Sequence, residues 1–222
     1  MLLVAALYNL VSRAQANINS QSNALLDLRK RIESLVSSTA VNAVKDATAD
    51  GNIQSRNVTT TLLFSDIRDF TGFADQNAAE VVVEFLNQIM TLQVEILKRH
   101  DGDVDKMIGD AVLARFDGEN GDKRALAAAR EIVDAVKHGD FPRALGIGIF
   151  HGEVISGAIG PEDRRDFTVI GNTVNMAARL CASAKANEVV VEESLADDAF
   201  EPVESILVKG RNDPLSIRRW HS

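Results

Sequence analysis

The 222-residue sequence predicts an α+β fold: a ferredoxin-like split βαβ core with an antiparallel-rich sheet flanked by helices, preceded by a long N-terminal helix. Two observations support this. Apolar residues recur with helical spacing from Val4 onward, with no Pro or Gly before Gly51. Beyond Gly51, β-rich and helical runs alternate in the order strand, helix, strand, strand, helix, strand. The chain is therefore expected to divide into an N-terminal signalling helix, residues 1–50, and a folded domain, residues 51–222.

The N-terminal segment keeps a heptad rhythm. The first apolar position holds Val4, Val11, Ile18, Leu25 and Ile32, and the second holds Leu7, Ala14, Gln21, Leu28 and Leu35. Branched residues at the first position and leucine at the second favour a parallel two-stranded coiled coil. The alternative is an amphipathic helix packed on its own domain. Residues 1–10 are apolar but shorter than the roughly 20 residues that span a bilayer, so we interpret them as the stump of a membrane helix and expect the cytoplasmic part of a membrane-anchored protein.

The elements of the domain follow from local patterns. Residues 58–64 are rich in threonine and apolar residues, which indicates a central strand. Gly109 and Asp110 separate two short β-rich runs, and Gly at the first central position suits a tight hairpin turn. The further predicted elements are helix 77–99, strands 103–108 and 111–116, helix 123–137, strand 143–150, a hairpin over about 154–170, helix 173–184, and two or three terminal strands.

Composition narrows the class of function. The formal net charge of −8 argues against a nucleic-acid binder, which would need a basic face. An acidic protein can still bind a polyphosphate if metal ions lie between the two. The single cysteine, Cys181, excludes an internal disulfide and fits a reducing compartment.

Two acidic positions are expected to meet at one edge of the sheet. Asp66 ends the first strand, and Asp110 lies on the tip of the hairpin. In the split βαβ topology the start of the middle strand lies beside the end of the first strand, so the two carboxylates would come together and bind a hard cation. Free backbone N–H groups in the turn that follows, at Phe70 and Thr71, can hold phosphate oxygens. Singly, Asp66 could cap a helix and Asp110 could merely form a turn.

A third motif lies in the predicted helix 173–184. Asn175 and Arg179 are four residues apart, so they share one helix face. An amide and a guanidinium side by side can grip a polyphosphate, and Arg does so with two hydrogen bonds. The alternative is a capped surface helix with a solvated arginine.

Together, the segments FSDI (64–67), KMIGD (106–110) and GNTVNMAAR (171–179) resemble class III nucleotidyl cyclases, over about residues 58–220. The resemblance implies that Asp66 and Asp110 bind two Mg²⁺ (or Mn²⁺), with the Ile67 carbonyl as a further ligand. It also implies that residues 51–222 form the catalytic domain.

The resemblance assigns the remaining positions to the substrate. Lys106 and Thr168 resemble the purine-selecting residues of one subclass; guanylate cyclases carry Glu and Cys there, so ATP is the expected substrate. Asn175 resembles the residue that orients the ribose, and Arg179 the one that stabilises charge on the α-phosphoryl group. Lys209 resembles a terminal phosphate-binding lysine, although a Lys-Gly pair could equally form a turn.

In this family one subunit supplies the metal-binding residues and the other the purine-selecting pair, Asn and Arg. A head-to-tail homodimer joined by the coiled coil, and driven by an upstream sensor or membrane domain, is therefore expected. The alternatives are a guanylate cyclase, a catalytically inactive nucleotide-binding regulatory domain, and a signalling coiled coil whose domain only makes dimer contacts. A diguanylate cyclase is excluded because the Gly-Gly-Asp/Glu-Glu-Phe turn is missing.

Overall fold

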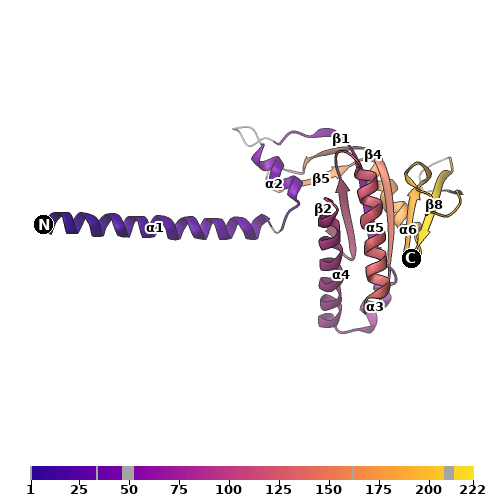
Figure 1. Ribbon diagram of the computed structural model, residues 1–222, viewed down its shortest axis with the longest axis horizontal. Coiled ribbons are helices and arrows are strands. Elements are labelled where there is room, and N and C mark those ends of the chain that lie inside the picture. Colours follow the sequence, from indigo (N-terminus) through magenta and orange to yellow (C-terminus); the bar gives the residue numbers. More distant parts are fainter. Residues whose placement is uncertain (1, 34, 47–52, 162, 208–212) are drawn as a thin grey trace.

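A twisted sheet with helices on both faces forms the domain, and helix α1 projects away from it (Figure 1). The computed structural model describes all residues except 1, 34, 47–52, 162 and 208–212. The described helices are α1 (Leu2–Glu33), α2 (Ser38–Lys45), α3 (Phe70–Gln76), α4 (Ala79–Arg99), α5 (Gly121–His138), α6 (Asn172–Ser183) and the 3₁₀ turn η1 (Glu193–Leu195). The strands are β1 (Arg56–Ile67), β2 (Asp103–Ile108), β3 (Ala111–Phe116), β4 (Leu145–Ile159), β5 (Asp166–Ile170), β6 (Glu188–Glu192), β7 (Glu204–Ile206) and β8 (Leu215–His221).

The order of the strands is that of the predicted core. Seven strands follow the order β2-β3-β1-β4-β6-β8-β7, and β5 pairs with the far half of β4. Strand β3 runs antiparallel to both β1 and β2, and β4 and β6 form the one parallel pair in the described sheet. The first four strands of this order, with α4 and α5, make the split βαβ unit. The predicted α+β class, the flanking helices and the long N-terminal helix are confirmed.

Alternation along β1 divides the domain into two packing layers. Leu63 and Ile67 belong to the larger core, with α4 and α5. Leu62, from the opposite face of the strand, packs with Ala177 of α6. Successive strand residues point to opposite faces, so Asp66 shares the α6 side of the sheet with Leu62.

One predicted break in the sheet is wrong. Strand 143–150 and the first arm of the hairpin are a single strand, β4, which pairs with β1 from Arg56↔Ser156 to Ile67↔Leu145. Gly152 lies within this strand, opposite Thr60 of β1. A Cβ there would lie 2.8 Å from Oγ1 of Thr173, so the glycine leaves room for the start of α6.

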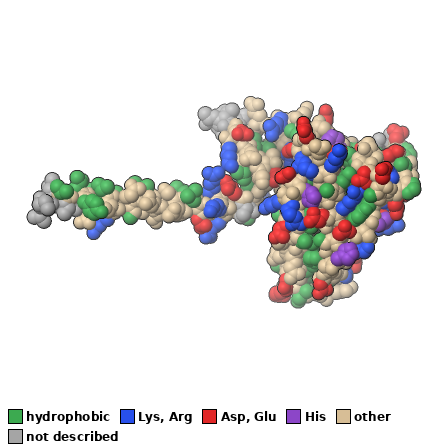
Figure 2. Space-filling model, viewed as in Figure 1, with side chains coloured by type: hydrophobic (Ala, Val, Ile, Leu, Met, Phe, Trp, Pro, Cys, Tyr) green, Lys and Arg blue, Asp and Glu red, His purple; other side chains and the backbone are tan. Residues whose placement is uncertain are grey.

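The N-terminal region also differs from a single helix. Helix α1 ends at Glu33, a second helix, α2, follows, and the short helix α3 was not predicted. The heptad residues of α1 are exposed, for example Leu25 at 66% and Leu28 at 54%. Figure 2 shows such hydrophobic side chains spaced along the projecting helix. The alternative in which this helix packs on its own domain is therefore wrong for the described residues, while its pairing with a second copy stays a prediction.

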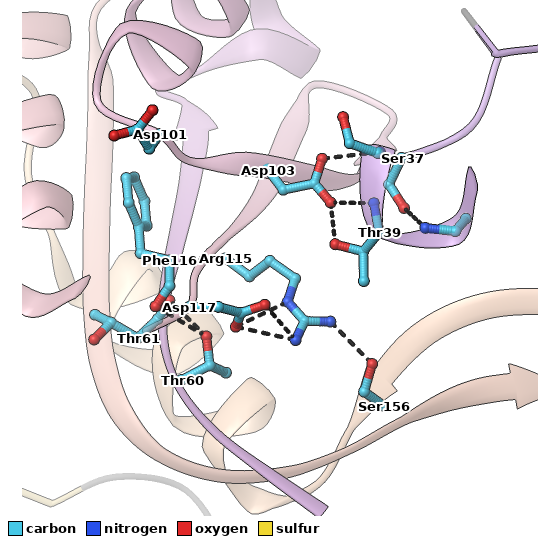
Figure 3. Close-up of polar contacts among 12 residues, drawn as sticks. Ser37, Thr39, Thr60, Thr61, Asp101, Asp103, Arg115, Phe116, Asp117 and Ser156 are labelled. Carbon is cyan, nitrogen blue, oxygen red and sulfur yellow. Dashed lines mark hydrogen bonds and ion pairs between the residues drawn. The ribbon is translucent and has the colours of Figure 1, made fainter. Parts of the chain in front are cut away.

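Helix α2 is held on the first residue of β2. The carboxylate of Asp103 accepts hydrogen bonds from the backbone N–H groups of Ser38 (3.0 Å) and Thr39 (2.8 Å) and from the Thr39 hydroxyl (Figure 3). A carboxylate at free N–H groups of a helix N-terminus is a favourable placement. The segment that precedes the domain is thus fastened to the strand that carries Lys106. None of the helices described is both long enough and apolar enough to cross a membrane.

Candidate functional site

Asp66 and Asp110 come together where β1 ends and the β2–β3 turn begins. Asp66 is opposite Ala111 in the β1–β3 ladder, so its neighbour across the sheet is the residue after Asp110. Gly109 adopts a φ of +63°, which glycine accepts readily and which turns the chain between β2 and β3. The structure therefore brings Asp66 and Asp110 together as the sequence predicts. We call them the carboxylate pair.

The electrostatics of the carboxylate pair favour a cation. Burial raises the pKa of Asp66, the Arg68 guanidinium opposes that rise, and the neighbouring Asp110 carboxylate adds to it. A carboxylate whose ionisation is opposed by burial and by a like charge gains from a divalent cation beside it, and oxygen donors suit Mg²⁺. The side chain of Ile67 is an alkyl group with no donor atom, so only its backbone carbonyl could join them. The described residues contain no cluster of three or more His, Cys, Asp or Glu side chains suited to a metal ion.

Arg68 is a residue of this site that sequence analysis missed. Its guanidinium hydrogen-bonds the Asp66 carboxylate and donates to the carbonyls of Asp66 (3.2 Å) and Ala184 (3.2 Å). It thus fixes Asp66 against the end of α6. Its position two residues after Asp66 could have signalled a partner on the same side of the extended chain.

Lys106 and Thr168, which we call the β2–β5 pair, come from strands that lie side by side. The Lys106 ammonium forms an ion pair with the Asp166 carboxylate. The Thr168 hydroxyl donates to Oδ2 of Asp105 over 2.7 Å. Lys106, Asp105 and Asp166 line a cavity of about 850 Å³ that reaches to α2 and the end of α1. The acidic partners were not predicted, because nothing local to either strand shows that β5 crosses beside β2.

Asn175 and Arg179 lie on the outer face of α6. The helix buries Thr173, Met176, Ala177, Leu180 and Cys181 toward the sheet. Positions 175 and 179 fall on the opposite side of a 3.6-residue helix. Asn175 is exposed. Arg179 makes no ion pair with any described residue, and its Nη1 lies 3.9 Å from Sδ of Met176. The predicted pair thus shares a face, and that face points away from the chain's own sheet.

Of the three predicted phosphate-binding positions, the structure describes Phe70 and Thr71. Phe70 and Thr71 begin α3, where the first N–H groups of a helix have no partner within it. Phe70 packs against the larger core and Thr71 is exposed. Lys209 lies outside the described residues.

Comparison with known proteins finds a family that spans the folded domain. The chain matches the family described as "Adenylate and Guanylate cyclase catalytic domain" over residues 53–216. An uncharacterized protein of Mycobacterium tuberculosis (strain ATCC 25618 / H37Rv) is 39% identical over 131 residues, covering 57% of this chain and 24% of that protein. The chain therefore spans about a quarter of the length of that relative.

Two solved structures cover the folded domain. The adenylyl cyclase CyaB from P. aeruginosa is 28% identical, with a TM-score of 0.67, over 75% of this chain and 95% of its own. The guanylyl cyclase Cya2 is also 28% identical, with a TM-score of 0.64, over 75% of this chain and 92% of its own.

Proposed function

The chain belongs to the family of adenylate and guanylate cyclase catalytic domains, and from this premise we propose that it is an adenylate cyclase. It would convert ATP to 3′,5′-cyclic AMP and pyrophosphate at sites shared between two copies of the chain. The observation that carries the proposal is the meeting of Asp66 and Asp110 beside the strand that bears Lys106.

The carboxylate pair fits two divalent cations, Mg²⁺ or Mn²⁺, bound through Asp66, Asp110 and the Ile67 carbonyl. When bound, the cations would ease ionisation of the ribose 3′-hydroxyl and neutralise the triphosphate and the pyrophosphate leaving group. Arg68 contributes by holding Asp66 in place through bonds that end on the backbone at Ala184. The N–H groups of Phe70 and Thr71, and Lys209, would bind phosphate oxygens.

Asn175 and Arg179 would act on the nucleotide held by the partner copy. Asn175 would orient the ribose, and Arg179 would stabilise charge on the α-phosphoryl group, a contribution of about 3–4 kcal/mol for one donor. Their outward orientation on α6 supports this assignment, since the buried face of the helix is committed to its own sheet. A symmetric dimer of identical chains would contain two such sites.

The choice of ATP over GTP rests on the β2–β5 pair. Similarity alone does not separate the two substrates, because an adenylyl and a guanylyl cyclase are equally identical to this chain. Lys106 would donate to a ring nitrogen of adenine. The Asp66, Asp110, Asn175 and Arg179 side chains argue against an inactive regulatory domain, which would lack some of them.

Helix α1 would join the two copies as a parallel coiled coil and transmit a signal from an upstream sensor. Its exposed heptad residues favour this, because a solvent-exposed apolar stripe gains by burial against a second helix. Replacing Leu25 and Leu28 with Glu should convert the protein to monomers in analytical ultracentrifugation and abolish activity. Unchanged activity at nanomolar protein concentration would contradict the coupling.

The proposal is tested by product formation. Purified protein is incubated with ATP or GTP and Mg²⁺ or Mn²⁺, and the cyclic nucleotide is quantified by chromatography. We expect cyclic AMP as the main product, with none after chelation of the metal. Cyclic GMP as the main product would instead support the guanylate cyclase alternative, and no product with nucleotide still bound would support the regulatory domain.

A further inference from the structure

We propose that Asp105 is a positioning residue that keeps the Thr168 hydroxyl as a hydrogen-bond acceptor toward the base, and so selects purines with a 6-amino group over those with a 6-oxo group. The inference rests on the proposed function and names the source of its base specificity. Asp105 lies outside the three sequence segments, 64–67, 106–110 and 171–179, that resemble the cyclases.

The direction of the Thr168–Asp105 bond carries the argument. A threonine hydroxyl has one hydrogen to donate and two lone pairs to accept with, whereas an ionised carboxylate can only accept. The 2.7 Å bond from Thr168 Oγ1 to Asp105 Oδ2 therefore uses the single hydrogen of Thr168. The other acceptor near that hydroxyl, the Val169 carbonyl, is 3.5 Å away. Only lone pairs of Thr168 are left for a ligand.

A lone pair at this position distinguishes the two purines. The 6-amino group of adenine would donate to it, while the 6-oxo group of guanine would bring a second acceptor against it. A binding site discriminates strongly against a substrate that leaves the site's buried polar groups without hydrogen-bond partners. Thr168 would thus act toward the base only as an acceptor, because Asp105 removes its ability to donate.

Strand β2 is irregular at Asp105, the residue that contacts Thr168. The β2–β3 register shifts between Val104 and Lys106, so Asp105 is the extra residue of a bulge. In a regular strand Asp105 and Lys106 would point to opposite faces. The bulge instead allows both to contact β5, Asp105 through Thr168 and Lys106 through Asp166. Bulges commonly re-aim a side chain beside an active site.

The surroundings of Asp105 fit this role. Asp105 is 8% exposed and Thr168 is 7% exposed, so little water competes for their bond. Burial raises the pKa of Asp105, and the Thr168 hydroxyl and the Lys106 and Arg115 charges oppose that rise. The second carboxylate oxygen, Oδ1, is buried with no hydrogen-bond partner among the described residues. Thr168 is thus the side chain that hydrogen-bonds this carboxylate, and Asp105 lines the same cavity as Lys106.

The experiment compares ATP, GTP and purine riboside 5′-triphosphate, which lacks the 6-amino group, by kcat/KM. The wild type should prefer ATP to the purine riboside by about tenfold, the size of one good hydrogen bond. In Asp105→Asn the amide can donate to Thr168 and free its hydrogen. The freed hydrogen could donate to the 6-oxo group of guanine, while one lone pair of Thr168 would remain for the 6-amino group of adenine. We therefore expect the preference for ATP over GTP to fall by about tenfold, with the preference for ATP over the purine riboside kept. Asp101→Asn, an exposed residue near the start of β2, is the matched control and should keep the preference.

A second pair of variants covers the case in which Asp105→Asn fails to fold, as judged by its melting curve. Thr168→Ser keeps the hydroxyl and should keep the preference for ATP over the purine riboside, whereas Thr168→Val should lose it. A merely structural role would lower turnover of all three nucleotides together, and equal loss in Asp105→Asn or equal behaviour of Ser and Val at position 168 would overturn the inference. Wild-type protein that neither binds nor cyclises a nucleotide would overturn the proposed function as well.

Discussion

In the carboxylate pair two like charges meet with one arginine beside them, whereas in the β2–β5 pair each side chain already has an acidic partner from the same chain. The first arrangement is left short of positive charge and gains from a cation. In the β2–β5 pair, both side chains already have hydrogen-bond partners before a ligand binds. A base must therefore displace Asp166 from Lys106, whereas at Thr168 it can use the lone pairs that the bond to Asp105 leaves free. One half of the proposed site therefore attracts its ligand, and the other half selects it.

The largest expected effect is at the carboxylate pair. Asp110→Ala should lower cyclase activity by about 10³-fold, since several kcal/mol of charge stabilisation depend on the cations. In chelator, however, Asp110→Asn should melt no lower than the wild type, because it removes a like charge from Asp66. Activity assays and melting curves with and without Mg²⁺ measure both. A variant that keeps a tenth of wild-type activity would contradict the metal-binding role of Asp110.

The next effect is a change of substrate at the β2–β5 pair. Lys106→Glu combined with Thr168→Cys should move the ATP-to-GTP ratio of kcat/KM toward GTP by about 100-fold or more, because the donors of guanine would then meet a carboxylate. Metal dependence should stay as in the wild type, since the carboxylate pair is unchanged. If both activities fell by the same factor, so that the preference for ATP was kept, these positions would not read the base.

A smaller effect is expected at Asp166, which must leave Lys106 before Lys106 can contact the base. The side chain of Asp166 is 68% exposed, and exposed ion pairs contribute about 0–1 kcal/mol. Asp166→Asn should therefore lower the KM for ATP by up to about fivefold, with kcat unchanged, because Lys106 no longer has to leave an acid. Steady-state kinetics at low salt measure this change. A rise in KM would show that Asp166 helps to bind the nucleotide.

The smallest effect concerns the cysteine behind the carboxylate pair. Burial raises the pKa of the Cys181 thiol to about 12, so at pH 8 roughly one molecule in ten thousand carries the thiolate. Iodoacetamide at pH 8 should leave activity unchanged within error, and mass spectrometry should find Cys181 unmodified in the native protein. Rapid modification would mean that α6 opens away from β4.

The carboxylate pair could be predicted from the sequence, whereas the partners of the β2–β5 pair could not. Asp66 and Asp110 follow regular strands and a tight turn, so strand order alone brings them together. Asp105 reaches Thr168 only through a bulge, and Asp166 reaches Lys106 only because β5 crosses beside β2. Helical spacing likewise placed Asn175 and Arg179 on one face of α6. The continuation of β4 beyond residue 150 could not be predicted, because the contact of Gly152 with Thr173 depends on packing.

The central claim is that carboxylates of one copy act with Asn175 and Arg179 of another, and mixing two inactive variants tests it most directly. Asp110→Ala and Arg179→Ala are each purified as folded dimers, mixed in equal amounts and allowed to exchange subunits, and cyclic AMP formation is measured. Half of the dimers would then be mixed, each with one intact site, so we predict recovery of about a quarter of wild-type activity. A mixture that exchanges subunits yet stays at the activity of the separate variants would contradict the account.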